Sequence, residues 1–498
     1  MLPLRLLLAL SLCVACGKRD RPSDAESDAR APMADSGAAD AGQEDATLGD
    51  AGLDGDAGRE DGRDDGGRTD AGVDGGLDPA RCPIGLADGC CPLLRYGGRD
   101  PDCPSLGCES LEASAPIELD DISGTRRATE WKGGTGLAWT GRELALARTD
   151  WGAAGEHREI VFELRGPDGS LRAGPIRTPE RTSSLLDSRA GEAALGYVVD
   201  LDRFVYANAT GRSYDAVGIE RDGSLAFTTA TGLSWCNWNS GGWVEMFPTG
   251  DRVLAVGHSY TCEGSTDEPR ASEILADGSL GLTQDYGTGG RRRHCWGASA
   301  ACDLECATPR FAFFCSNENE LQLRGFDPVS LVAEPSEVLA RDFVAYPRGS
   351  AIASDGERFL VVHTPGSVSA RSAHLQAQIY RPGVGWEGPT LYTPVFEGMM
   401  RLIWTGDGYL LAATTWSPEI GEHGAPLGSQ HRFSVRLWHF DADGRLRETF
   451  DNDPGLPGLH PYLAWAGGQL AISWVRPVDP ERWPSDEPRR FLRMYRCP

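Results

Sequence analysis

Lysine is almost absent from this chain of 498 residues: only Lys18 and Lys132 occur, beside 46 arginines. A Schiff base or an amine nucleophile requires a lysine, so such chemistry in the globular part would depend on Lys132 alone. Long apolar runs are also missing. Beyond residue 16 no stretch is apolar for long enough to cross a bilayer, so we expect the mature protein to be soluble apart from any N-terminal anchor.

Several motifs of catalytic and metal sites are missing as well. The nine histidines show neither His-x-His nor His-Glu-x-x-His spacing, and there is no Gly-x-Ser-x-Gly nucleophile elbow. Gly133-Gly134-Thr135-Gly136 lacks the lysine of a phosphate-binding loop. The sequence therefore assigns no catalytic residue, no metal ligand and no cofactor.

The formal net charge is −25, and its acidic part is concentrated near the N-terminus. Residues 17–80 hold 18 Asp and Glu against 7 Lys and Arg, in an Asp, Ala, Gly and Arg background with hardly any apolar side chain. Ordering such a segment has nothing to offset its entropy cost, so we expect a disordered tether. Its aspartates lack the ligand order of an EF-hand, which argues against calcium. An acidic protein also argues against nucleic acid as a partner.

The first 16 residues carry an export pattern. An apolar stretch, Leu6 to Ala15, follows Arg5 and ends in small residues before Cys16. This resembles a bacterial lipoprotein signal peptide with its lipobox, although Cys13 stands where leucine is usual. An ordinary cleaved signal peptide or a short anchor is the alternative.

The resemblance implies a signal peptide over 1–15, lipidation of Cys16 and a lipidated tether over 16–80. It also implies anchoring in the cell outer membrane, because Gly17 is not the aspartate that retains such proteins at the inner membrane. The protein would then be periplasmic or surface-exposed. In arrangement the chain is similar to surface lipoproteins of GC-rich Gram-negative bacteria.

Twelve cysteines remain once Cys13 is removed and Cys16 is lipidated. Five fall in residues 81–114, which we interpret as a disulfide-stapled segment because exported chains meet an oxidising compartment. A zinc site would need Cys-x-x-Cys pairs or nearby histidines, which this segment lacks. Cys497 is expected to bond to this segment. The twelve disulfide candidates are Cys82, Cys90, Cys91, Cys103, Cys108, Cys236, Cys262, Cys295, Cys302, Cys306, Cys315 and Cys497.

A repeat dominates residues 115–498. Its mark is a short turn, Asp-Gly-Ser-Leu or Asp-Gly-Arg-Leu, which begins at Asp168, Asp222, Asp277 and Asp443. Weaker versions lie at 327–331 and 382–385, so the 275 residues from Asp168 to Asp443 hold five intervals of 55 residues each on average. Each Asp-Gly lies between alternating apolar runs, a hairpin signal, and a second hairpin precedes each turn, as in 136–148 and 402–414. Two hairpins per unit predict four-stranded blades of an all-β fold, a β-propeller.

Counting the first hairpins, near 138, 192, 246, 312, 351, 403 and 464, predicts seven blades, with six or eight as alternatives. The last unit shows only three strands, so its fourth is expected from residues 115–131. Trp139, Trp404 and Trp465 recur at one position of the first strand and are predicted to lie in the core between blades.

Long connections follow the second strand of each unit, and long loops on a rigid scaffold often carry binding residues. The predicted binding residues lie near the ends of these second strands: Arg148, Trp151, His258, Tyr260, His363, Trp416 and Trp474. The alternative is that these side chains anchor loops. We expect a non-enzymatic propeller that binds a protein, peptide or glycan. A polysaccharide hydrolase or lyase with carboxylates around the channel is the rival, and a purely structural surface protein is a third possibility.

Overall fold

In the computed structural model the description covers a set of separate segments between residues 111 and 496. These segments are 111–119, 135–151, 158–179, 193–210, 213–234, 244–260, 267–286, 295–301, 310–315, 320–327, 329–340, 350–363, 374–394, 400–416, 433–453, 458–466, 469–477 and 488–496. The expected signal peptide, the tether and nearly all of the 81–114 segment, with Cys16 and Cys497, lie outside them. Among the described residues no helix is long and apolar enough to span a membrane.

Six sheets each contain four strands that are consecutive in sequence and antiparallel. The first three comprise β3 (Thr135–Trp139), β4 (Leu144–Trp151), β5 (Arg158–Arg165) and β6 (Leu171–Pro179); β7 (Ala194–Val198), β8 (Arg203–Thr210), β9 (Ser213–Glu220) and β10 (Leu225–Ser234); and β11 (Val244–Thr249), β12 (Arg252–Tyr260), β13 (Asp267–Ile274) and β14 (Leu280–Asp285). The next three comprise β15 (Cys295–Ala301), β16 (Arg310–Cys315), β17 (Glu320–Gly325) and β18 (Glu337–Ala340); β19 (Ser350–Ser354), β20 (Phe359–His363), β21 (His374–Arg381) and β22 (Gly385–Pro394); and β23 (Met400–Trp404), β24 (Gly408–Trp416), β25 (Phe433–Asp441) and β26 (Leu446–Asp451). A 3-10 turn, η2 (Val199–Leu201), joins β7 to β8.

A five-stranded sheet joins the two ends of the described chain. It contains β27 (Leu459–Ala466), β28 (Gln469–Pro477) and β29 (Pro488–Arg496), with the short β1 (Glu112–Ala113) and β2 (Ile117–Glu118) both paired to β29. The sequence placed this closing strand within 115–131. β2 lies inside that range, and β1 lies just before it.

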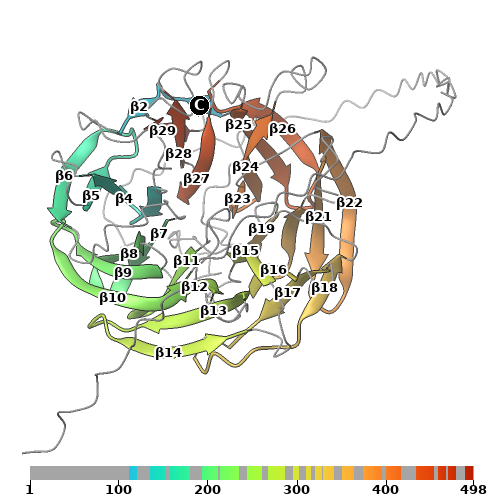
Figure 1. Ribbon diagram of the computed structural model, residues 1–498. Coiled ribbons are helices and arrows are strands. Elements are labelled where there is room, and N and C mark those ends of the chain that lie inside the picture. The colour runs from blue at the N-terminus through green and yellow to red at the C-terminus, as the bar shows by residue number, and fades with distance from the viewer. Residues whose placement is uncertain are drawn as a thin grey trace, which may run out of the picture. The chain divides into compact units, whose positions relative to one another are not determined.

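The sheets are arranged around a common centre, with the first strand of each innermost and the fourth outermost (Figure 1). Successive inner strands contact one another: β3 lies beside β7, β7 beside β11, β15 beside β19, β19 beside β23 and β23 beside β27. The contact of β27 with β3 brings the five-stranded sheet against the first sheet. The predicted all-β propeller is therefore confirmed, and residue 312, the position counted for the fourth hairpin, lies on β16, which pairs antiparallel with β15.

The strands nearer the centre are buried on both faces because each sheet is covered there by its two neighbours. In β4, the leucines Leu144 and Leu146 pack in a cluster with the five-stranded sheet, whereas Ala145 and Ala147 pack with β7 to β9. All four side chains are fully buried. A strand covered on both faces is apolar at successive positions, which explains why this segment does not alternate with polar residues.

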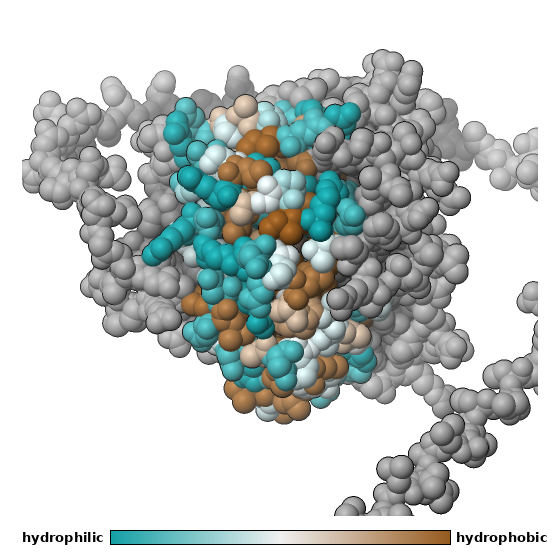
Figure 2. All heavy atoms as spheres, turned by 90° about the vertical axis from the view of Figure 1, so that its left-hand side faces the viewer, coloured by the Kyte–Doolittle hydropathy of each residue, from teal (hydrophilic) through white to brown (hydrophobic). Residues whose placement is uncertain are grey.

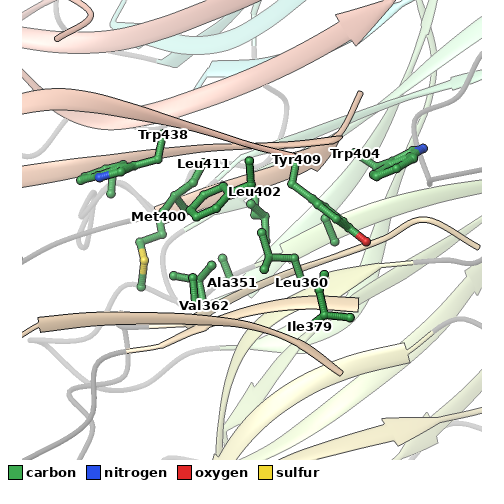
Figure 3. Packing of buried hydrophobic residues seen from close by; sticks show 14 residues of the cluster. Ala351, Leu360, Val362, Ile379, Met400, Leu402, Trp404, Tyr409, Leu411 and Trp438 are labelled. Atoms are coloured by element: carbon green, nitrogen blue, oxygen red, sulfur yellow. The ribbon is translucent and has the colours of Figure 1, made fainter. Parts of the chain in front are cut away.

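The contact between the β19–β22 and β23–β26 sheets shows the same arrangement (Figure 3). Ala351, Leu360 and Val362 of the first sheet face Met400 and Leu402 of the second. The three tryptophans predicted to lie in the core are buried, which confirms that prediction; they are Trp139, Trp404 and Trp465.

The Asp-Gly turns connect the third and fourth strands and also touch the neighbouring sheet. Asp277 Oδ1 accepts hydrogen bonds from the Ser279 backbone N–H and hydroxyl at 2.8 and 2.6 Å. Gly278 has a φ of +83°, and a Cβ there would overlap the ring of Phe227 on β10. The glycine therefore serves the turn and lets one sheet approach the next.

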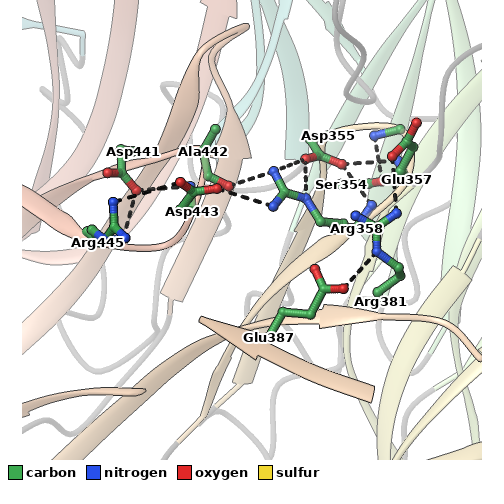
Figure 4. A network of polar contacts seen from close by, with 11 residues as sticks. Ser354, Asp355, Glu357, Arg358, Arg381, Glu387, Asp441, Ala442, Asp443 and Arg445 are labelled. Carbon is green, nitrogen blue, oxygen red and sulfur yellow. Dashed lines mark hydrogen bonds and ion pairs between the residues drawn. The ribbon is translucent and has the colours of Figure 1, made fainter. Parts of the chain in front are cut away.

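Arginine side chains tie other turns together. Arg358 donates to Asp355 in its own turn and to the carbonyl oxygen of Ala442 in the next sheet, at 3.0 and 2.9 Å (Figure 4). Arg203 makes the equivalent contact with the carbonyl oxygen of Ala276 at 2.7 Å. Hydrogen bonds from charged groups are stronger than neutral ones, so these arginines fix the spacing of neighbouring sheets.

Candidate functional site

The inner strands begin at the end of the sheets where the second strands finish. Thr135 pairs with Arg148, and Ser350 pairs with His363, so the starts of β3 and β19 lie beside the ends of β4 and β20. We call this the loop end of the sheets. It is the end at which the sequence placed the binding residues.

Arg148 lies in the interior at this end. Its guanidinium pairs with Glu163 Oε1 at 2.7 Å and donates to the carbonyl oxygen of Leu119 at 2.6 Å. Glu163 also pairs with Arg165 at 2.6 Å. Only 1% of the Arg148 side chain is exposed, so it ties the N-terminal segment to the first sheet. This burial favours the loop-anchor alternative for Arg148.

His363, the last residue of β20, is also buried. Burial disfavours the charged imidazolium and lowers the pKa of His363 to about 4. The imidazole is therefore neutral at physiological pH, and its burial again favours a structural role.

Trp474 on β28 is the third buried member of the predicted set. It is 1% exposed and stacks on Phe491 with a centroid separation of 5.7 Å. The guanidinium of Arg493 lies 5.7 Å from the Trp474 ring. Trp474 belongs to the core cluster between the last two sheets, which is the anchoring role that the sequence left open.

The other four predicted residues lie at or within two residues of the ends of their strands, but their side chains lie outside the description. Trp151 pairs with Arg158, and Trp416 pairs with Phe433. His258 and Tyr260 pair with Pro269 and Asp267. The backbone thus places all four at the loop end, and their role in binding stays a prediction. Most of the connections beyond them also lie outside the described residues.

The inner strands themselves carry few charges. The sequences of β3, β7, β11, β15, β19, β23 and β27 contain one acidic residue, Glu245 on β11. It is half-buried and occupies the second position of its strand. Because a glycosidase of the usual kind needs two carboxyl groups, these strands alone do not supply its acid and base.

An arginine and a tyrosine meet at the same end of the sheets. The guanidinium of Arg401, second residue of β23, lies 5.0 Å from the ring centroid of Tyr462 on β27. Arg401 is half-buried, and its Nη1 donates to the carbonyl oxygen of Met400 at 3.1 Å. His460, two residues before Tyr462, has a φ of +54°, so the backbone of β27 is distorted where it enters the sheet.

Sequence reasoning overlooked these inner-strand residues. A usable signal existed, since Arg401 and Glu245 are single charges inside the otherwise apolar strands MRLIW and VEMFPT. The contact between Arg401 and Tyr462 joins two repeats and could not be inferred from spacing. Among the described residues no group of three or more His, Cys, Asp and Glu forms a metal-binding cluster.

No protein-family model matches the chain, and no curated protein matches it. Among solved structures, the polysaccharide lyase Uly1 has 10% identity and a TM-score of 0.47 over 77% of this chain and 94% of its own. A neuraminidase-like protein of a flat-faced bat isolate from Peru has 9% identity and a TM-score of 0.38 over 81% and 96%. Hydrazine synthase of Kuenenia stuttgartiensis has 8% identity and a TM-score of 0.39 over 57% and 75%. At these values the similarities do not identify an activity.

Proposed function

We propose that this chain is a membrane-anchored extracytoplasmic lipoprotein whose propeller binds a protein, peptide or glycan at the loop end of its sheets. In this proposal the five-stranded sheet is the closing blade of a seven-bladed ring. Cys16 carries the lipid anchor in the outer membrane, residues 17–80 are the tether, and binding does not lead to a chemical reaction.

The proposal rests on how few acidic residues the inner strands contain. A hydrolase or lyase that used the channel would be expected to place two or three carboxylates near the starts of these strands, whereas the described inner strands themselves contain one acidic residue, Glu245. Arg401, half-buried with its guanidinium 5.0 Å from the buried ring of Tyr462, is instead a group that can contact a ligand without reacting with it. Arginine is enriched among residues that dominate binding energies, because it offers a large flat surface with polar groups at its end.

Trp151, His258, Tyr260 and Trp416 extend the proposed site, because the backbone places them at the same end. Aromatic side chains there would stack on sugar rings or clasp a peptide. The described core supplies the rigid support that such loops need.

Glycan and peptide arrays probed with the full chain test the proposal. Once a ligand is found, Arg401→Gln should weaken its binding at least about tenfold, which corresponds to about 1.4 kcal/mol. Arg447→Gln is the matched control, since Arg447 lies on the outer strand β26, where it pairs with Asp407 at 3.2 Å. Equal affinities of the wild type and Arg401→Gln for the ligand would show that the ligand does not bind at Arg401. Thermal melting of both variants shows whether each remains folded.

A further inference from the structure

The four Asp-Gly turns between third and fourth strands share one backbone. In each turn the glycine is buried with a φ between +77° and +83°, and its N–H donates to the carbonyl oxygen three residues earlier at 2.8–3.0 Å. The aspartate is exposed in all four. Figure 2 shows hydrophilic residues over much of the side that carries β6, the strand after the first of these turns, so water reaches this rim. The turns are Asp168-Gly169, Asp222-Gly223, Asp277-Gly278 and Asp443-Gly444.

Three of these turns hold the aspartate carboxylate with a serine two residues later. One carboxylate oxygen accepts the serine hydroxyl at 2.6 Å and the serine backbone N–H at 2.8–3.0 Å. These two hydrogen bonds lower the pKa of each aspartate, so its carboxylate stays ionised to lower pH. They also fix the orientation of the carboxylate toward the serine. The three pairs are Asp168 with Ser170, Asp222 with Ser224 and Asp277 with Ser279.

The turn at Asp443 holds its aspartate differently. Arg445 stands where the other turns have serine, and its backbone N–H donates to Asp441 Oδ1 at 2.8 Å instead of to Asp443 (Figure 4). The Asp443 side chain is 58% exposed and has Arg358 at 3.4 Å and Arg445 at 3.9 Å. Both contacts are longer than the serine bonds, so the Asp443 carboxylate is held less firmly than its three counterparts.

We propose that Asp443 is a modification site, at which the chain converts spontaneously to isoaspartate faster than at the aspartates of the three serine turns. The Gly444 backbone nitrogen attacks Cγ of the protonated Asp443 carboxyl, the N–Cγ bond forms, and the N–H proton and the carboxyl OH leave as water. Water then adds to the α-carbonyl carbon of Asp443 in this five-membered imide, and the bond from that carbon to the Gly444 nitrogen breaks. The main chain now runs through Cγ and is one methylene longer.

The serine slows this reaction in the other turns. Its two hydrogen bonds must break before the carboxyl carbon can reach the glycine nitrogen, and they also oppose the protonation that lets the oxygen leave as water. One net hydrogen bond corresponds to a change of about two- to tenfold in rate. Because the backbone of the four turns is the same, the side-chain contacts of the aspartate decide their order of reactivity.

Isoaspartate at residue 443 would also disturb the contact with the neighbouring sheet. Arg358 donates to the carbonyl oxygen of Ala442 at 2.9 Å, one residue before the reacting aspartate. A Cβ on Gly444 would lie 3.0 Å from Ile379, so this turn already fits closely against the next sheet. A main chain that is one methylene longer alters both contacts, and we expect the modified protein to melt at a lower temperature.

Prolonged incubation of the full chain in mildly acidic buffer, followed by tryptic peptide mapping, tests the proposal. Trypsin releases Asp443 in the peptide 437–445, and isoaspartate changes the retention time of a peptide but not its mass. Fragmentation by electron transfer distinguishes residue 443 from Asp441 in the same peptide. We expect isoaspartate to form at Asp443 at least about threefold faster than in any of the three serine turns. An equal or lower rate at Asp443 overturns the proposal.

Two substitutions at exposed positions test whether the serine controls the rate. Arg445→Ser supplies the hydroxyl that the other turns have and should slow the reaction at Asp443 about threefold. Ser279→Ala removes that hydroxyl and should accelerate the reaction at Asp277 by a similar factor. Asp222 is the internal control, because its rate should be the same in both variants and in the wild type. Thermal melting before incubation checks that both variants are folded. Unchanged rates at Asp443 and Asp277 overturn the proposal.

Discussion

The buried guanidinium of Arg490, in the last strand, donates a hydrogen bond at 2.9 Å to the carbonyl oxygen of Thr149, which lies 341 residues earlier. The same guanidinium lies 3.4 Å from Asp150. Beside it, the N–H of Leu119 donates to the carbonyl oxygen of Arg490 at 2.9 Å. The five-stranded sheet is thus joined to the first sheet by a buried charged group as well as by packing.

Removing the Arg490 guanidinium should weaken the contact between the five-stranded sheet and the first sheet. Arg490→Leu leaves Asp150 paired with the partly exposed Arg177 at 3.8 Å, so the loss should approach but not exceed the about 3–5 kcal/mol of a broken buried ion pair. Arg489→Leu is the control, because Arg489 is 44% exposed and pairs with Glu118 at the surface, where such pairs contribute at most about 1 kcal/mol. Urea denaturation of both variants measures the difference. Equal losses of stability in the two variants would show that Arg490 does not stabilise the contact between these two sheets.

The glycine of the Asp-Gly turn offers a second test. Gly278→Ala and Gly383→Ala both place a Cβ at positive φ, +83° and +74°, so both should lose about 1–2 kcal/mol. Only at residue 278 does the new Cβ meet a neighbour, the Phe227 ring, whereas nothing lies within 4 Å at residue 383. We therefore expect a lower melting temperature for Gly278→Ala. If the two variants melt alike, the turn does not depend on close approach to the next sheet.

Acid should destabilise the protein through His363. Burial lowers its pKa to about 4, whereas an unfolded histidine has a pKa of about 6.5. Between these values the unfolded chain binds more protons, so the free energy of unfolding falls as the pH drops from about 6.5 to about 4, by up to about 3 kcal/mol. His363→Gln removes the titrating group and should reduce this dependence. Denaturation curves at about pH 7.5 and about pH 4.5 check it. A variant with the wild-type slope would assign the acid sensitivity to other groups.

The strand register points to one disulfide. Cys295 on β15 and Cys315 on β16 are direct partners in an antiparallel pair. Such partners have Cα atoms about 4.5 or 5.5 Å apart, and disulfides join Cα atoms about 4.4–6.8 Å apart. We expect a Cys295–Cys315 bond in the oxidised protein, seen as a linked peptide in a non-reducing digest. Either cysteine recovered as a free thiol, or linked to a different cysteine, would contradict this.

The fold could be predicted because its repeat depends on local chemistry. An Asp-Gly turn needs a side-chain acceptor and a residue that accepts positive φ, and both are visible in the sequence at Asp277 and Gly278. The tryptophans at Trp139, Trp404 and Trp465 could be assigned to the core because they share one position in the repeat.

The site was harder to predict because it depends on contacts between repeats. Arg148 and Trp474 look like loop residues, but partners on other strands, Glu163 and Phe491, cover them. The apolar run of β4 indicates that both of its faces are buried, but the run ends at Ala147 and does not indicate that Arg148 is buried as well. The contact between Arg401 and Tyr462 likewise joins two sheets, and the sequence of neither repeat predicts it.

Analysis of the ligand after binding tests the central claim, a propeller that binds without reacting, most directly. A glycan or peptide identified on the array is incubated with the full chain, and mass spectrometry compares it before and after. We predict that it is recovered intact and that Arg401→Gln weakens its capture. Recovery of cleaved fragments that are absent without the protein would contradict the account and identify the chain as a hydrolase or lyase.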